Sequence, residues 1–110
     1  IVDFLQENPG KNIADIVIAC YGLSFKPDID DLRESPALNI TREIARFHKG
    51  TVLAVEPNIR NLVNEEFQLA LIPDAQAIAS ISVLLVDHKE FQVAGKPSKG
   101  KVIDTKGIWR

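Results

Sequence analysis

The sequence predicts an α/β fold: a doubly wound parallel sheet of about five strands between two layers of helices. Short apolar runs rich in β-branched residues alternate along the chain with stretches of helical periodicity. The first run, from Ile13 to Tyr21, is nearly continuous in apolar residues, as expected of a strand covered on both faces. Residues 22–36 then show the pattern of a strand end, a loop and a helix start. In parallel α/β sheets, ligands bind at such loops, which follow the carboxyl ends of the strands.

Four more strands and four helical stretches follow from the same patterns. The expected strands are 51–55, 68–72, 82–86 and 101–104. The expected helical stretches are 36–48, 59–66, 74–80 and a single turn at 89–93. Asp74 follows a proline and is the expected N-cap of the third stretch.

The helix at 36–48 has the clearest signals. Ser35 is expected to be its N-cap, and Pro36 fits the first helical position, where a missing N–H does no harm. Gly50 is expected to end the helix in a left-handed conformation. Its apolar stripe, expected to be the buried face, consists of Ala37, Ile40, Ile44 and Phe47.

Strands that alternate with helices form right-handed crossover units. We therefore expect the strand order 3-2-1-4-5 and a Rossmann-like, three-layer α/β/α architecture. The ligand crevice of such a sheet lies where the order reverses, between the first and fourth strands. The residues that follow those strands, 22–26 and Asp87–His88, are therefore expected to face the crevice.

Composition limits the functions to consider. With 110 residues and a net charge of −2, the chain suits one domain and gives no reason to expect nucleic acid or a membrane as partner.

The single Cys20 excludes an internal disulfide, fits a reducing cytoplasm and is expected to be a buried thiol. Residues 1–10 read like the end of a linking helix from an upstream region, with the domain itself at 11–110.

Several residues near the expected crevice could carry chemistry. Glu56 ends the second strand, where an acidic residue often holds a ribose, but the glycine fingerprint of dinucleotide sites is missing after Gly22. Glu56 is therefore predicted to be a solvated turn residue. Lys26 follows Phe25 and is either a surface lysine or part of a pair that stacks on a base and meets a phosphate.

The remaining charged residues each leave two interpretations open. Arg33, in an acidic loop that lacks the spacing of a calcium site, suits phosphate or ribose oxygens but also an ion pair. His88 is a proton shuttle or, as favoured here, a hydrogen-bonded loop residue. Lys106 is part of a chain-end turn or a second cation at the same edge as Lys26. His48 is placed to interact with a helix dipole, and no metal constellation is present.

Residues 22–36 closely resemble the motif that opens the C-terminal domain of the UDP-glucose/GDP-mannose dehydrogenase family. The matching residues are Phe25, Lys26, Asp31, Arg33 and Ser35, and the likeness extends through 55–57, 87–91 and 102–106. Residues 56–59 and 104–109 resemble the branch that oxidises UDP-N-acetylmannosamine to the uronate.

The resemblance implies a role for each matching position. Phe25 and Lys26 would contact the UDP-sugar substrate, and Arg33 would reach NAD bound by another domain. Lys106 stands where many relatives carry an arginine for the substrate diphosphate. Lysine keeps the charge without the two-pronged hydrogen bond, so Arg110 is a second candidate for that role.

For the whole enzyme, the resemblance implies a two-step, NAD-dependent oxidation of a sugar C6 alcohol to a carboxylate. Upstream NAD-binding and linking domains would complete a homo-oligomeric, cytoplasmic bacterial enzyme that serves polysaccharide biosynthesis. The catalytic cysteine lies upstream in the family and does not match Cys20, so no catalytic residue is expected here and these residues alone should be inactive. The alternatives are another UDP-sugar dehydrogenase, such as one acting on UDP-glucose, a standalone non-catalytic nucleotide-binding domain, or a purely structural interaction domain.

Overall fold

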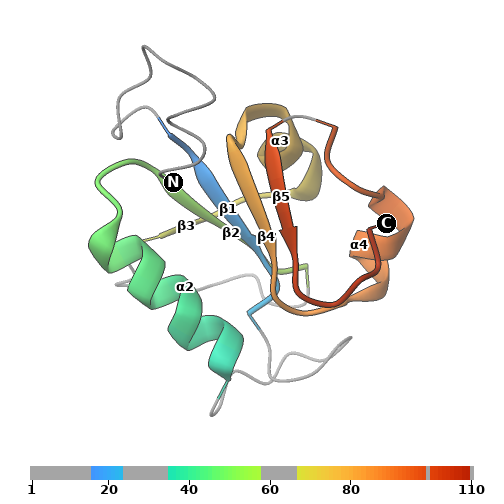
Figure 1. The fold of residues 1–110 in the computed structure, drawn as a ribbon, viewed down its shortest axis with the longest axis horizontal. Coiled ribbons are helices and arrows are strands. Elements are labelled where there is room, and N and C mark those ends of the chain that lie inside the picture. The colour runs from blue at the N-terminus through green and yellow to red at the C-terminus, as the bar shows by residue number, and fades with distance from the viewer. Residues whose placement is uncertain (1–15, 24–34, 58–66, 99, 110) are drawn as a thin grey trace.

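The computed structural model describes residues 16–23, 35–57, 67–98 and 100–109. Its centre is a five-stranded parallel sheet in the order β3-β2-β1-β4-β5 (Figure 1). The strands are β1 (Ile18–Tyr21), β2 (Val52–Val55), β3 (Gln68–Leu69), β4 (Ile81–Leu84) and β5 (Lys101–Asp104). The order confirms the predicted topology, including its reversal between β1 and β4.

Helices cover both faces of the sheet, which confirms the three-layer architecture (Figure 1). α2 (Pro36–Phe47) packs on one face, where its Leu38 and Ala45 meet Val52 and Ala54 of β2. α3 (Ile72–Ile78) and α4 (Lys89–Ala94) cover the other face. That second core consists of Ala19, Tyr21, Leu53, Val55, Ala75, Ala79, Leu84, Phe91 and Trp109.

Two predicted boundaries differ because a proline starts a helix. β3 ends at Leu69, short of the predicted Ile72, and α3 already begins at Ile72. Pro73 fits the first turn of α3, where no N–H is needed. Asp74 therefore lies inside that first turn, so its predicted role as N-cap is wrong, and Leu71 holds the cap position without a side-chain hydrogen bond. The helical stretch predicted at 59–66 lies outside the described residues.

The helix α2 confirms its predicted start and part of its predicted buried face. Ser35 is the N-cap and accepts a hydrogen bond from the Leu38 N–H at 3.2 Å. Ala37 of the predicted stripe is buried and Ile44 packs against the core, whereas Ile40 and Phe47 are 43% and 72% exposed. The other buried residues of the helix are Leu38, Thr41 and Ala45. Small side chains let the helix approach the strands closely, and the Thr41 hydroxyl is satisfied because it donates to the Ala37 carbonyl at 2.9 Å.

The C-terminal end of α2 also differs from the prediction. His48 is the C-cap in an extended conformation, and its N–H donates to the Ile44 carbonyl at 2.8 Å. Its ring Nε2 lies 2.7 Å from the Ile16 carbonyl, so the imidazole ties the helix end to the residues before β1. Gly50 is not among the glycines with positive φ, so its predicted role as a left-handed stop is wrong.

Cys20 is buried in β1, as predicted, and burial raises the pKa of its thiol to about 11 despite a hydrogen bond with Thr41. Because the ordinary value is 9.0, the thiolate is about a hundredfold scarcer at pH 8 than in an unfolded chain. We expect a disulfide reagent to label Cys20 at least about a hundredfold more slowly in native buffer than in urea. Immediate stoichiometric labelling of the folded chain would contradict this expectation.

Candidate functional site

Because the strands are parallel, the segments that leave β1, β2, β4 and β5 all meet at the carboxyl edge of the sheet. The strand order reverses between β1 and β4, which is the position where the sequence analysis expects a ligand crevice. The described residues at the edge are 22–23, 56–57, 85–88 and 105–109.

The segments that follow β1 and β4 approach each other closely at this edge. Gly22 has a φ of 101°, and a Cβ placed on it would lie 2.5 Å from the Cβ of Val86. The N–H groups of Leu85 and Val86 both donate to the Tyr21 carbonyl, at 2.9 and 3.2 Å. Only glycine permits this approach, so Gly22 is required by the geometry of the edge.

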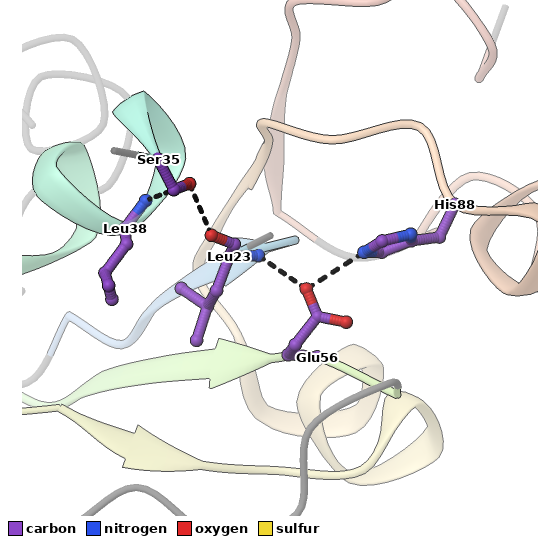
Figure 2. Close-up of polar contacts among 5 residues, drawn as sticks. All are labelled: Leu23, Ser35, Leu38, Glu56 and His88. Atoms are coloured by element: carbon purple, nitrogen blue, oxygen red, sulfur yellow. Dashed lines mark hydrogen bonds and ion pairs between the residues drawn. The ribbon is translucent and has the colours of Figure 1, made fainter. Parts of the chain in front are cut away.

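Glu56 is buried, with 5% of its surface exposed, and its side chain crosses the carboxyl end of β1 (Figure 2). Its Oε1 accepts a hydrogen bond from the Leu23 N–H at 2.7 Å and lies 2.9 Å from Nε2 of His88. The prediction of a solvated turn residue is therefore wrong. The cause is tertiary: the end of β1 presents a buried N–H, and the carboxylate from the neighbouring strand satisfies it.

His88 is fully buried and precedes α4, where it occupies the N-cap position. Its ring packs at a tilt against Phe91, with the ring centroids 5.3 Å apart. The bond to Glu56 confirms the interpretation of His88 as a hydrogen-bonded residue. The pair joins the end of β2 to the start of α4 across the end of β1.

Both backbone polar groups of Leu23 are hydrogen-bonded to side chains (Figure 2). Its N–H binds Glu56, and its carbonyl accepts a hydrogen bond from the Ser35 hydroxyl at 2.5 Å. Ser35 also caps α2 by accepting from Leu38. Two N–H groups at the end of β1 and the start of α2, those of Leu23 and Leu38, therefore bind side chains of this protein.

A second carboxylate organises the segment after β5. Oδ1 of Asp104 accepts hydrogen bonds from the N–H groups of Lys106 and Gly107 at 2.8 and 2.7 Å, and Oδ2 accepts from that of Trp109 at 2.8 Å. The Thr105 hydroxyl donates to the Leu84 carbonyl at 2.6 Å. Lys106 is exposed at the tip of this turn, which the structure places at the carboxyl edge.

Trp109 anchors the far end of the same segment. Its indole Nε1 donates to the Phe91 carbonyl at 3.0 Å, and its ring meets Tyr21 edge-on with the centroids 5.0 Å apart. The side chain is buried between the sheet and α4. The turn that carries Lys106 is thus fixed at both ends, by Asp104 and by Trp109.

A cleft of about 650 Å³ lies on another side of Glu56. It is lined by Val55, Glu56, Pro57 and residues 69–73, which are mostly apolar. The described lining residues include no cation.

Of the predicted site residues, the structure describes Lys106 alone. Phe25, Lys26, Arg33 and Arg110 lie outside the described residues, as do the acidic residues 28–31. Leu23, the described residue nearest to Phe25 and Lys26, and Trp109, which precedes Arg110, both lie at the carboxyl edge. Sequence reasoning missed the organising role of Asp104, although an aspartate before Thr-Lys-Gly is a recognisable turn signal.

Within the residues that the structure describes, no group of three or more histidine, cysteine or acidic side chains could hold a metal ion. The helices that are described are all too short or too polar to cross a bilayer.

Comparison with known proteins identifies the class to which this fold and edge belong. A family model described as "UDP-glucose/GDP-mannose dehydrogenase family, UDP binding domain" matches residues 19–110. The chain therefore belongs to the UDP-glucose/GDP-mannose dehydrogenase family, as its UDP-binding domain.

Individual relatives agree with that assignment. The chain is 50% identical over 105 residues to the UDP-N-acetyl-D-mannosamine dehydrogenase of Salmonella typhi, covering 91% of this chain and 25% of the relative. It is 48% identical over 103 residues to an NDP-N-acetyl-D-galactosaminuronic acid dehydrogenase of Ralstonia solanacearum, covering 90% of this chain and 24% of the relative. The chain thus spans about a quarter of the length of these relatives.

Solved structures show the same fold. A UDP-N-acetyl-mannosamine dehydrogenase from Staphylococcus aureus superposes with a TM-score of 0.69 at 25% identity, over 99% of this chain and 26% of the other. A UDP-glucose dehydrogenase from Pyrobaculum islandicum gives a TM-score of 0.72 at 22% identity, over 97% and 25% of the respective chains, and supports the fold alone.

Proposed function

We propose that this domain binds the UDP part of a UDP-sugar at the carboxyl edge of its sheet. The observation that carries the proposal is the match of residues 19–110 to a UDP-binding domain whose β1 and β5 segments leave the same edge. Each segment carries a lysine close to its strand, Lys26 after β1 and Lys106 after β5. Two cations at one edge suit a diphosphate.

The individual roles follow from side-chain chemistry. Phe25 offers a flat apolar ring to the UDP-sugar, and Lys26 offers an ammonium to its phosphates. Lys106 binds the diphosphate as a point charge from a turn that Asp104 holds in place. Arg110 follows the anchored Trp109 and is the second candidate for a diphosphate contact.

The complete enzyme is proposed to be an NAD-dependent UDP-sugar 6-dehydrogenase, with N-acetylmannosamine as the sugar. An alcohol R–CH2OH, two NAD+ and one water give R–COO−, two NADH and three protons. Curated relatives that are 46–50% identical to this chain carry the name UDP-N-acetyl-D-mannosamine dehydrogenase and support this sugar. UDP-glucose is the alternative substrate, and the assay of the complete enzyme with both UDP-sugars separates the two.

NAD does not fit the described edge in the manner of a dinucleotide domain, because the N–H of Leu23 and the N-terminus of α2 already bind Glu56 and Ser35. NAD is therefore assigned to another domain, with Arg33 reaching toward it from this one. The nucleophilic cysteine is likewise assigned to an upstream segment, since Cys20 is buried with a raised pKa. These 110 residues alone are proposed to be inactive, and the parent enzyme to be a cytoplasmic homo-oligomer of bacterial polysaccharide synthesis.

Titration of UDP into the 110-residue chain by calorimetry tests the binding proposal. We expect a dissociation constant well above micromolar, because other domains would supply part of the contacts. Lys26→Ala and Lys106→Ala should each weaken binding by about tenfold, the effect of losing one charged hydrogen bond. Lys106→Arg should bind UDP at least as tightly as the natural chain, because a guanidinium can form a bidentate hydrogen bond with a phosphate.

UMP, which lacks the second phosphate, serves as the ligand control. At least one of the two alanine substitutions should leave the UMP dissociation constant unchanged. Absence of heat with UDP from the natural chain would refute the binding proposal and favour a purely structural domain. A submicromolar dissociation constant would instead refute the sharing of the substrate between domains.

A further inference from the structure

We propose that Glu56 and His88 are positioning residues for nucleotide binding. The inference rests on the proposed function, and it assigns to these two buried side chains the task of fixing where the segment after β1 leaves the sheet. Neither residue is proposed to touch the reacting atoms. Their effect on the ligand would pass through Leu23, which stands three positions before Lys26 in the sequence.

The geometry makes Leu23 the point at which this segment is held. Its N–H binds Oε1 of Glu56 at 2.7 Å and its carbonyl binds the Ser35 hydroxyl at 2.5 Å. Its side chain is fully buried in the core with Leu38 and Phe67. The packing fixes the side chain, but the direction of the backbone depends on the two hydrogen bonds.

His88 determines where the Glu56 carboxylate lies. Its Nε2 is 2.9 Å from the same oxygen that accepts the Leu23 N–H, and both side chains are buried (Figure 2). A buried carboxylate is costly unless it is hydrogen-bonded. The contacts with Leu23 and His88 therefore help to hold this oxygen at the carboxyl end of β1, and the oxygen in turn holds Leu23.

The pair also explains how the edge differs from a dinucleotide site. In such sites the N–H groups after the first strand bind a ligand phosphate directly. Here the Glu56 carboxylate takes the N–H of Leu23, so the protein supplies its own anion at that position. Phosphate affinity then depends on cationic side chains such as Lys106 and Lys26, and hence on how accurately their segments are placed.

The test compares Glu56→Ala with Glu56→Gln, which keeps an oxygen acceptor for Leu23. The readouts are the UDP dissociation constant and the amide proton shift of Leu23 in a proton–nitrogen NMR spectrum. We expect Glu56→Ala to weaken UDP binding by about tenfold or more and to move the Leu23 amide upfield, since a charge-assisted bond is lost. Glu56→Gln should stay within about threefold of the natural chain.

Thr41→Val is the matched control, because it removes a buried hydrogen bond of α2 away from the carboxyl edge. It should lower stability while leaving the UDP dissociation constant unchanged. The proposal is overturned if Glu56→Ala binds UDP as tightly as the natural chain, or if Thr41→Val weakens binding as much as Glu56→Ala does. Should Glu56→Ala not fold, His88→Leu decides instead: about threefold or greater weakening supports the proposal and unchanged binding overturns it.

Failure of the proposed function would look different. The natural chain would then give no heat with UDP, while the Leu23 amide would still report on the contact with Glu56. An upfield shift of that amide in Glu56→Ala would support the positioning contact itself, and an unmoved amide would overturn it.

Discussion

Replacing Trp109 by alanine is expected to lower the free energy of unfolding of the chain by about 3–5 kcal/mol. The indole is 4% exposed, packs edge-on against Tyr21 and donates to the Phe91 carbonyl at 3.0 Å. Its removal leaves a cavity between the sheet and α4 and an acceptor without its donor. Urea unfolding followed by far-ultraviolet circular dichroism measures the change.

Two further variants separate the contributions to this loss. Trp109→Phe keeps an aromatic ring against Tyr21 but loses the indole donor, so it should retain a substantial part of the stability lost in the alanine variant. Phe47→Ala removes an aromatic side chain that is 72% exposed and should cost less than about 1 kcal/mol. If Trp109→Ala is no more destabilising than Phe47→Ala, Trp109 does not anchor the segment after β5.

Replacing Gly22 by alanine should cost about 2–4 kcal/mol through two separate causes. The φ of 101° lies in a region that L side chains rarely adopt. In addition, the new Cβ would lie 2.5 Å from the Cβ of Val86 and 2.9 Å from its backbone nitrogen, so the segments after β1 and β4 would have to separate. Thermal and urea unfolding of the purified variant give the size of the loss.

Gly95→Ala is the matched control for this substitution. Gly95 has a φ of 80°, but a Cβ placed on it meets no atom within 4 Å. With a ψ of 175° it lies in a region that is essentially restricted to glycine, so the substitution should cost only the backbone strain, about 1–3 kcal/mol. Equal losses in the two variants would show that the close approach of Gly22 to Val86 contributes nothing to stability.

Both expected losses fall on residues that join the core to the proposed site. Trp109 ends the turn that carries Lys106, and Gly22 begins the segment that leads to Lys26. For this reason, a variant of either residue that still folds should also bind UDP more weakly. The comparison with Phe47→Ala and Gly95→Ala distinguishes this effect from a general loss of stability.

The order of the strands could be predicted from the sequence because it depends on a pattern that every element shares. Apolar runs alternating with helical stretches allow few right-handed parallel topologies, and 3-2-1-4-5 is a common one. Local signals that act within one or two residues also succeeded, such as Ser35 as the cap of α2. These features need only local chemistry and chain connectivity.

Predictions for Asp74 and Gly50 failed at helix ends, and others failed because the partner of a residue comes from a distant element. The predicted stripe with Ile40 and Phe47 satisfies helical periodicity as well as the face that is actually buried, and only packing against β2 selects the latter. Glu56 looked like a turn residue because the partners described for it, Leu23 and His88, lie 33 and 32 positions away in the chain. No local pattern reports contacts of that kind.

The sequence by itself determined the layered fold, the strand order and the buried thiol, since these follow from periodicity, chirality and residue chemistry. The tertiary structure alone decided that the β1 end is capped by Glu56 and His88 and that Asp104 and Trp109 fix the turn of Lys106. The physical reason is that a buried hydrogen-bonding group takes whichever partner the fold brings within about 3 Å. That choice exists only once the strands have been placed side by side.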